Sequence, residues 1–243
     1  MISILGKELK AFFSSLIGYL VIATFLIFIG LFMWIFTDTS ILDNRYASLA
    51  QLFGIAPMIF VFLIPAITMR SFSEEKQRGT IEFLNTKPIK TWQILIGKYL
   101  GNFLLVVITL IPTLIYVWSV YQLGAPRGNI DIGEIIGSYL GLLFLAGLFT
   151  AIGLFTSSLS DNQIVAFLIA AVLCFIFYLG FDYLSRLPIF FGNTDLIVQK
   201  LGAEYHYASI SKGKIELRDV VYFITTTGFV LWGTWIAVTK HKW

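Results

Sequence analysis

The feature that most constrains this chain is a series of long runs that contain no charged residue. Each run reaches the length of roughly 20 apolar residues that crosses a bilayer as a helix. The six runs are Ala11–Thr37, Ala47–Met69, Tyr99–Pro126, Ile135–Ser160, Asn162–Phe181 and Val220–Thr239. Because 58% of the 243 residues are hydrophobic and 13% are charged, one small core could not bury this apolar surface. We therefore predict an all-α, polytopic membrane protein.

The runs predict one transmembrane domain over residues 1–243 with six helices. We place these spans at about 17–37, 49–69, 98–121, 135–157, 162–184 and 220–239. Pro65 and Pro112 lie inside two of the spans and are expected to bend them. One further apolar segment, Leu187–Thr194, is too short to span the membrane. We expect it to lie at the membrane interface or to form a re-entrant segment.

The first sixteen residues predict an amphipathic helix that lies in the membrane interface. Apolar residues recur there at helical spacing, namely Ile2, Leu5, Leu9, Phe12 and Leu16. Lys7, Glu8 and Lys10 fall on the other side, as in helices that lie along a membrane surface. A simple extension of the first span is the alternative.

The positions of Lys and Arg predict the orientation of the chain. An even number of spans puts both termini on one side, and ten of the seventeen basic residues belong to that side. Seven belong to the other side, where five acids accompany the five basic residues of the last loop. Since cytoplasmic segments carry the excess of Lys and Arg, we expect both termini in the cytoplasm.

Small residues and caps indicate how the helices pack. Glycines spaced by four share one helix face and let two helices approach closely in lipid. The predicted packing glycines are Gly97, Gly101, Gly133, Gly137 and Gly141. They suit either a pair of helices that slides or plain tight packing. Ser160 and Gln163 have the spacing of a capping box, which predicts a helix that starts at this serine.

The groups that catalysis or ion coupling would need are missing from the predicted spans. The two histidines, His206 and His241, lie outside them, so neither a serine–histidine dyad nor a histidine-bound metal fits there. No acidic or basic residue lies deep within a span, which argues against ion-coupled transport. No Gly-Lys pair belongs to a P-loop. We therefore expect no enzyme activity, no bound cofactor or metal and no nucleic-acid partner, and Cys174 as an apolar filler.

A charged stretch, SEEKQRGTIEFLNTKPI, lies between the second and third spans. Ser71 and Glu74 have capping-box spacing and predict a helix start, while Gly79 is expected to end that helix. Beyond Thr80, which can cap the next turn, lies a cytoplasmic apolar surface rimmed by charges. Its members are Ile81, Phe83 and Leu84, with Glu75, Arg78 and Glu82 at the rim. Such a surface suits a protein partner, although these residues could also fold back on the spans.

This stretch resembles the segment between the second and third helices of ABC-2-type transporter permeases. In that family a charged run is followed by Gly-Thr, a short helix, and Pro with an apolar residue. The matching parts here are Glu74–Arg78, Gly79-Thr80, Ile81–Thr86 and Pro88-Ile89. The plan of an amphipathic start, six spans and a short loop between spans four and five is similar as well. Within the family the chain most resembles gliding-motility-associated permeases of the GldF type, with NosY-like permeases as near relatives.

The resemblance implies a permease subunit in the inner membrane of a bacterium. The stretch would then form a coupling helix that docks on a separate cytoplasmic P-loop ATPase, which binds ATP and Mg. The implied docking residues are Glu74, Glu75, Arg78, Gly79, Thr80, Ile81, Glu82, Phe83 and Leu84. The implied partners are a GldA-like ATPase and either a GldG-like membrane subunit or a second copy of the chain. The alternative is a membrane anchor that transmits ATPase-driven motion without moving a solute.

Overall fold

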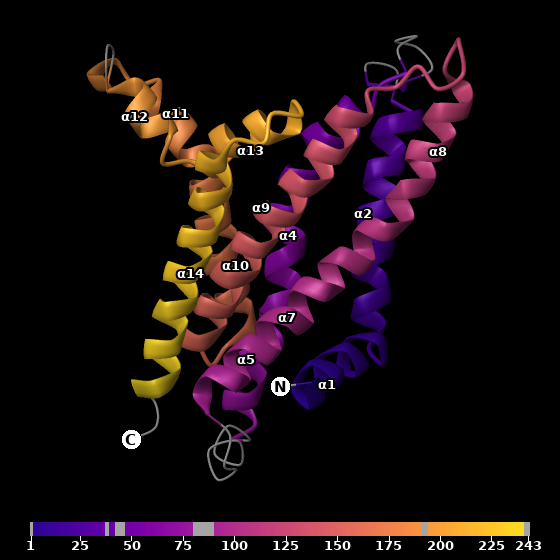
Figure 1. Ribbon diagram of the computed structural model, residues 1–243. Coiled ribbons are helices and arrows are strands. Elements are labelled where there is room, and N and C mark those ends of the chain that lie inside the picture. Colours follow the sequence, from indigo (N-terminus) through magenta and orange to yellow (C-terminus); the bar gives the residue numbers. More distant parts are fainter. Residues whose placement is uncertain (1, 37–38, 42–46, 80–89, 191–193, 241–243) are drawn as a thin grey trace.

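The computed structural model describes residues 2–36, 39–41, 47–79, 90–190 and 194–240 (Figure 1). Within these ranges the chain is helical and contains no strand, which confirms the all-α prediction. The helices are α1 (Ile2–Phe13), α2 (Leu16–Trp34), α4 (Ala50–Thr68), α5 (Arg70–Gln77), α7 (Thr91–Leu110), η1 (Ile111–Thr113), α8 (Leu114–Leu123), α9 (Ile132–Leu159), α10 (Gln163–Phe175), η2 (Ile176–Gly180), α11 (Phe181–Ser185), η3 (Pro188–Phe190), α12 (Asp195–Gln199), α13 (Ala203–Ser211) and α14 (Leu217–Lys240).

Several helices are long and apolar enough to cross a membrane, as the charge-free runs predict. Among the described residues five such helices occur, at Ala50–Gln77, Thr91–Leu123, Ile132–Leu159, Gln163–Ser185 and Leu217–Lys240. A sixth span results if the bent pair α1 and α2, which meet at 70°, counts as one. The chain is thus a polytopic helical membrane protein.

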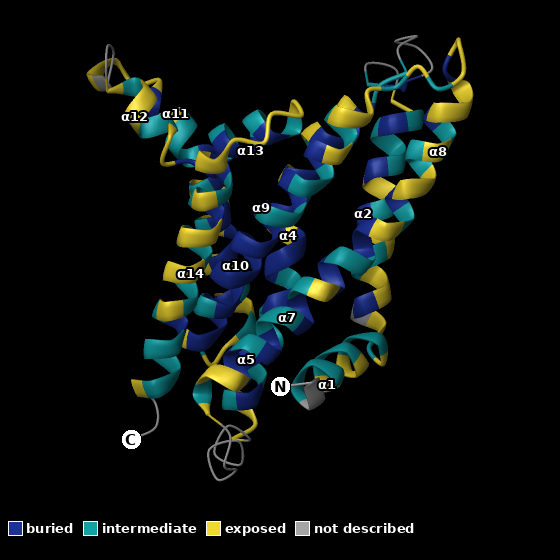
Figure 2. Ribbon diagram, viewed as in Figure 1, coloured by how far each residue is buried: buried dark blue, intermediate teal, exposed yellow. Residues whose placement is uncertain are grey.

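Helix α9 is the centre of the bundle. It packs against α4, α10 and α14, and also against α5, α7 and α13. Its buried face appears in Figure 2 beside that of α4. At the crossing with α4, Gly153 lies directly against Thr68, so a side chain at Gly153 would clash. Small residues therefore set how closely these two spans approach, as is usual in lipid.

The two intramembrane prolines that we expected to bend their helices behave differently. Pro112 lies in the 3₁₀ turn η1 between α7 and α8, so the α-helical pattern is interrupted there within the continuous span Thr91–Leu123. Pro65 lies inside α4, which runs on from Ala50 to Thr68. A proline in a membrane helix is tolerated where neighbouring groups satisfy the freed backbone.

The glycine series on α9 faces a short helix rather than another span. An added Cβ at Gly141 would come within 3.0 Å of the Tyr207 ring on α13, and one at Gly137 would meet the Ile210 carbonyl. At the opposite end of the bundle, a Cβ at Gly101 would come within 2.9 Å of Glu8 on α1. Gly133 lies in the first turn of α9, and Gly97 is buried on α7. These glycines therefore admit the two peripheral helices, α13 and α1.

The start of α10 corrects one cap that the sequence suggested. The Asn162 side chain accepts a hydrogen bond from the Ile164 amide at 2.9 Å and is the N-cap. Ser160 instead accepts a hydrogen bond from the Asn162 amide at 3.1 Å. The predicted capping box that starts at Ser160 is therefore wrong, because the helix begins two residues later.

Candidate functional site

Helix α5 continues the second span beyond the apolar run. It follows α4 after Met69, whose backbone is helical and whose side chain makes no cap hydrogen bond. The Ser71 hydroxyl accepts a hydrogen bond from the Asn102 amide group of α7 at 2.8 Å. The predicted capping box of Ser71 and Glu74 is therefore wrong, because the chain is already helical at Met69 and Ser71 is used in packing.

The end of α5 lies where the sequence places it. Gly79 has a φ of 66°, and its amide donates to the Lys76 carbonyl at 3.0 Å. This left-handed conformation is one that glycine adopts without steric cost, so the predicted helix end is confirmed. The five following docking candidates lie outside the described residues: Thr80, Ile81, Glu82, Phe83 and Leu84.

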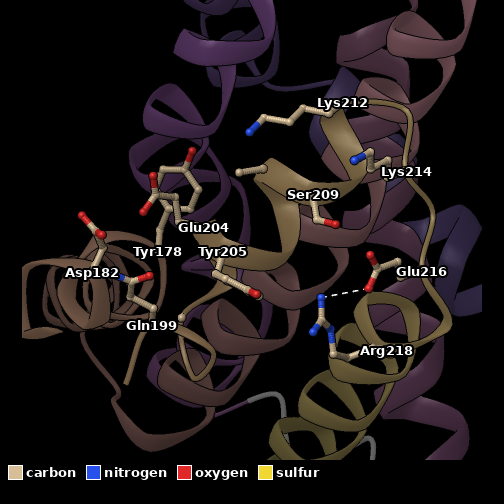
Figure 3. A pocket seen from close by; sticks show the side chains of 12 residues that line it. Tyr178, Asp182, Gln199, Glu204, Tyr205, Ser209, Lys212, Lys214, Glu216 and Arg218 are labelled. Carbon is tan, nitrogen blue, oxygen red and sulfur yellow. Dashed lines mark hydrogen bonds and ion pairs between the residues drawn. The ribbon is translucent and has the colours of Figure 1, made fainter. Parts of the chain in front are cut away.

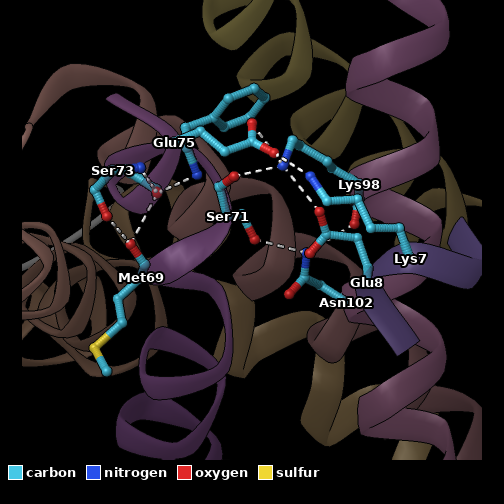
Figure 4. Close-up of polar contacts among 10 residues, drawn as sticks. Lys7, Glu8, Met69, Ser71, Ser73, Glu75, Lys98 and Asn102 are labelled. Atoms are coloured by element: carbon cyan, nitrogen blue, oxygen red, sulfur yellow. Dashed lines mark hydrogen bonds and ion pairs between the residues drawn. The ribbon is translucent and has the colours of Figure 1, made fainter. Parts of the chain in front are cut away.

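The amino group of Lys98 is the centre of a buried polar cluster between α1, α5 and α7 (Figure 4). Only 2% of Lys98 is exposed. Its Nζ lies 2.9 Å from Glu8 Oε1 and 3.1 Å from Glu75 Oε2, and it donates to the Ser71 carbonyl at 2.5 Å. Because an isolated buried charge is costly, this arrangement of two carboxylates and a carbonyl is what keeps the lysine inside.

A second lysine completes this inner cluster, which we define as Lys7, Glu8, Ser71, Glu75, Lys98 and Asn102. Lys7 Nζ donates to Glu75 Oε1 at 2.9 Å. Partial burial alone would lower the pKa of Lys7, but Glu75 and nearby acids raise it above its ordinary value. Two lysines and two glutamates balance, so the cluster is neutral as a whole.

The opposite side of α5 is held by the end of α9. The Ser157 hydroxyl donates to the Met69 carbonyl at 2.9 Å and accepts from the amides of Phe72 and Ser73 at 3.0 and 3.1 Å. These amides belong to the first turn of α5, where a helix lacks partners for its N–H groups. Lys76 adds a hydrogen bond to the Ser158 carbonyl at 2.7 Å. Its Nζ also lies 3.6 Å from Asp161.

The predicted docking residues on α5 separate into two groups. Glu75 is buried within the inner cluster and so does not rim a surface. Arg78 pairs with Glu74 at 2.7 Å, and the Arg78 side chain is 70% exposed. Only this pair, together with Gly79, lies at the surface next to residues 80–89.

A cavity of about 470 Å³ lies beside the inner cluster. Lys7, Glu8, Glu75 and Lys98 line it together with Arg70. Among the described residues no group of three or more His, Cys, Asp or Glu side chains is placed to hold a metal ion. The groups of this site that the structure brings together are the ion pairs between α1, α5 and α7.

The sequence reasoning missed most of the inner cluster. Lys98 was counted among the basic residues of the cytoplasmic side and is the first residue of the predicted third span, while Glu8 was expected on the polar side of an interface helix. Lys98 and Asn102 are four residues apart near the start of an apolar helix, so they share one helix face. The Asn102 side chain donates a hydrogen bond to the Lys98 carbonyl at 2.8 Å. This spacing was the one available signal, since the acidic partners come from distant segments.

Comparisons with known proteins agree with the class that the fold defines, a polytopic helical membrane protein. The model of the ABC-2 family of transporter proteins matches residues 42–199. The chain belongs to this family.

Two curated relatives are similar over much of the chain. The probable multidrug ABC transporter permease YbhR of Escherichia coli strain K12 is 25% identical over 181 residues. The aligned part is 73% of this chain and 45% of the relative, and the protein of the same name from Escherichia coli O157:H7 matches equally. The chain thus spans less than half the length of these relatives.

Proposed function

We propose that this chain is the membrane-spanning permease subunit of an ABC transporter, driven by an ATPase on a separate polypeptide. The ATPase would dock on residues 80–89 at the cytoplasmic end. One observation carries this proposal: α5, which leads directly into residues 80–89, is bonded to α1 and α7 on one side and to α9 on the other. A displacement of residues 80–89 would therefore move α1, α7 and the central helix α9 together.

The mechanism needs no bond-making step in this chain. An ATPase that binds the permease differently with ATP and with ADP shifts the balance between two arrangements of the spans. The inner cluster suits such a relay, because its ion pairs join three helices and those of the buried Lys98 resist separation more strongly than they would in water. Six spans are few for a broad path, so we propose pairing with a second membrane subunit or a second copy.

Co-purification tests the docking surface. Phe83→Asp with Leu84→Asp would place two carboxylates in the apolar contact, so the permease should stay in the membrane and lose its ATPase in a pull-down. The matched control is Leu196→Asp with Ile197→Asp, an exposed neighbouring apolar pair at the far end of the bundle. Loss of the ATPase in the control alone, or its retention in both variants, would contradict the proposal.

The finer assignment that we propose is a gliding-motility-associated complex with GldA-like and GldG-like partners. It is supported by the order of the charged run, Gly-Thr pair, short segment and proline in Glu74–Ile89. The curated relatives, by contrast, are named as probable multidrug transporter permeases. Reconstitution of the purified complex in vesicles separates the possibilities. ATP-driven efflux of hydrophobic drugs would favour a multidrug-type exporter. ATP hydrolysis without solute movement would favour the membrane anchor.

A further inference from the structure

A polar cavity of about 410 Å³ lies at the end of the bundle opposite α5. It is formed between α11, α12, α13 and the start of α14. Its volume is within the range of small-molecule sites, roughly 300–1,000 Å³. Neither the inner cluster nor the proposed docking surface includes any of its residues, so it calls for a separate explanation.

Charges of opposite sign are separated across this outer cavity. Figure 3 shows one side formed by Asp182, Gln199 and Glu204, the other by Lys214, Glu216 and Arg218, and Lys212 extended between them. A ligand that spans the cavity would meet the carboxylates of Asp182 and Glu204 at one end, and at the other end Lys214 beside the ion pair of Arg218 and Glu216. The cavity is therefore complementary to a zwitterion.

On the acidic side of the cavity, one of the two carboxylates has a basic partner within the described ranges and the other has none there. Asp182 pairs with Arg186 at 2.6 Å, whereas among the described residues no basic group lies within ion-pair distance of Glu204. Desolvation, and then the charge of Asp182, raise the pKa of Glu204, while Arg186 acts in the opposite direction. An ammonium group with N–H donors would relieve both effects, since charge-assisted hydrogen bonds stabilise the ionised carboxylate.

The basic side offers two lysines that are free to bind an anion. Arg218 is held by Glu216 at 2.9 Å and lies over the Tyr205 ring. In the part of the chain that the structure describes, Lys212 and Lys214 have no ion-pair partner. They flank Gly213, whose φ of 76° turns the chain after α13, and both line the cavity, with Lys214 opposite the acidic side and Lys212 extended between the two sides (Figure 3).

The walls of the cavity are held in place by buried bonds. His206 Nδ1 lies 2.7 Å from Asp219 Oδ1, and its Nε2 lies 2.9 Å from the Lys200 carbonyl. The Tyr222 hydroxyl donates to the Leu201 carbonyl at 2.7 Å. These contacts join α13, α14 and the turn after α12. A site that is formed before its ligand arrives loses less conformational entropy on binding.

Exposed apolar side chains occur on the outer helices and at the start of α14, near the chain segments that form this cavity. The outer helices α11, η3 and α12 project from the bundle (Figure 1) and carry exposed Leu187, Ile189, Leu196 and Ile197. Ile189 is 84% exposed, and Leu217 at the start of α14 is 79% exposed. A charged headgroup in the cavity would therefore have apolar surface beside it for acyl chains.

We propose that the outer cavity binds a phosphoethanolamine group, and that its source is the headgroup of a phosphatidylethanolamine lipid. The ammonium lies against Glu204 and Asp182, and the phosphate lies against Lys212 and Lys214. The acyl chains lie on the exposed apolar residues of the outer helices. This binding is a property of the chain alone and does not depend on the ATPase.

Binding of short-chain lipids to the purified full chain in detergent tests the proposal by calorimetry. The probes are dihexanoyl phosphatidylethanolamine, phosphatidylglycerol and phosphatidylcholine, and free phosphoethanolamine. We expect phosphatidylethanolamine to bind about tenfold more tightly than the other two lipids, because glycerol lacks the cation and choline lacks N–H donors. Equal affinities for the three lipids would overturn the proposal.

Variants assign the two halves of the site. Glu204→Gln should remove the preference for phosphatidylethanolamine over phosphatidylglycerol. Lys212→Met with Lys214→Met should weaken both lipids by about tenfold, since both contain phosphate. The controls Asp195→Asn and Arg127→Met remove charges at the same end but outside the cavity, and should change neither affinity.

Unchanged binding by the cavity variants would overturn the site. Free phosphoethanolamine that binds as tightly as the lipid would overturn the lipid as the source.

Discussion

At the scale of single residues, burial and pairing explain why Lys98 can lie inside an apolar bundle. Two of its acidic contacts come from helices that are far away in the sequence, α1 and α5. Lys7 binds the same Glu75, but its side chain is 63% exposed. The two lysines therefore make similar bonds in different surroundings, and their loss should have different costs.

Replacing Lys98 by Met should destabilise the protein strongly. The change leaves Glu8 and Glu75 with one unbalanced buried charge, and breaking a buried pair typically costs about 3–5 kcal/mol. Thermal unfolding of the purified variant in detergent measures the effect. The double variant Lys98→Met with Glu75→Gln restores neutrality and should recover part of the loss.

The matched control is Lys7→Met, which removes the exposed partner of Glu75. The Lys7 side chain is 63% exposed, so solvent screens its ion pair with Glu75 more than it screens the pairs of the buried Lys98, and this variant should lose less stability than Lys98→Met. Equal losses for the Lys7 and Lys98 variants would show that burial does not determine their contributions.

Glu204 predicts a dependence of stability on pH. Its pKa is raised in the folded protein above the ordinary value of 4.5, so folding favours the protonated form. Protonated Glu204 therefore adds to the free energy of unfolding at pH values below 4.5. This contribution is lost as the pH rises through the pKa of Glu204 in the folded protein. Glu204→Gln should therefore be at least as stable as the parent at pH 7, measured by the melting temperature without added lipid. A variant less stable than the parent at pH 7 would contradict this.

At the scale of elements, α5 shows how tertiary contacts override local sequence signals. The sequence places a helix start at Ser71, yet the helix follows directly from α4 because Ser157 satisfies the amides of Phe72 and Ser73. A local irregularity at Pro112 and the helix end at Gly79 were predictable, since both depend on the backbone of one residue.

The candidate site was predictable only in part for the same reason. Glu75 and Arg78 look alike in sequence as charged residues at a cytoplasmic helix. Their roles separate because Glu75 faces Lys98 on α7, and no local pattern reports that contact. Charge-free length predicted the spans, whereas pairing between distant segments decided which charges are buried.

Ser157→Ala should weaken the junction between α4 and α5. The variant loses one hydrogen bond that Ser157 donates and two that it accepts, and unsatisfied buried backbone groups cost roughly 1–3 kcal/mol. The neighbouring Ser158→Ala is the control, because the Ser158 hydroxyl donates within its own helix to the Phe155 carbonyl. Urea unfolding should show a clear loss for the first and a small one for the second. The reverse order would contradict the role given to Ser157.

At the scale of the whole molecule, the two ends of the bundle differ in construction. The end with α1 and α5 is joined by ion pairs between helices, whereas the end with α11 and α12 exposes short helices around a polar cavity (Figures 1 and 2). The distribution of Lys and Arg predicts that the first end faces the cytoplasm.

Cysteine labelling tests this orientation. Cys174 is the single cysteine and is buried, so Cys174→Ala gives a background without thiols. On that background, Lys212→Cys should react with a membrane-impermeant maleimide in intact cells whose outer barrier is permeable to it. Arg78→Cys should react only after the membrane is opened. The opposite pattern would invert the predicted topology.

The neutrality of the inner cluster also limits how the sequence of this protein can drift. Its four charges come from three separate helices and balance only when all are present. Loss of Lys98 in a descendant sequence would leave an excess negative charge, which a single further change at Glu8 or Glu75 would remove. Substitutions at these positions should therefore occur in pairs of opposite charge. Positions on three helices that are distant in the sequence would therefore show correlated substitutions.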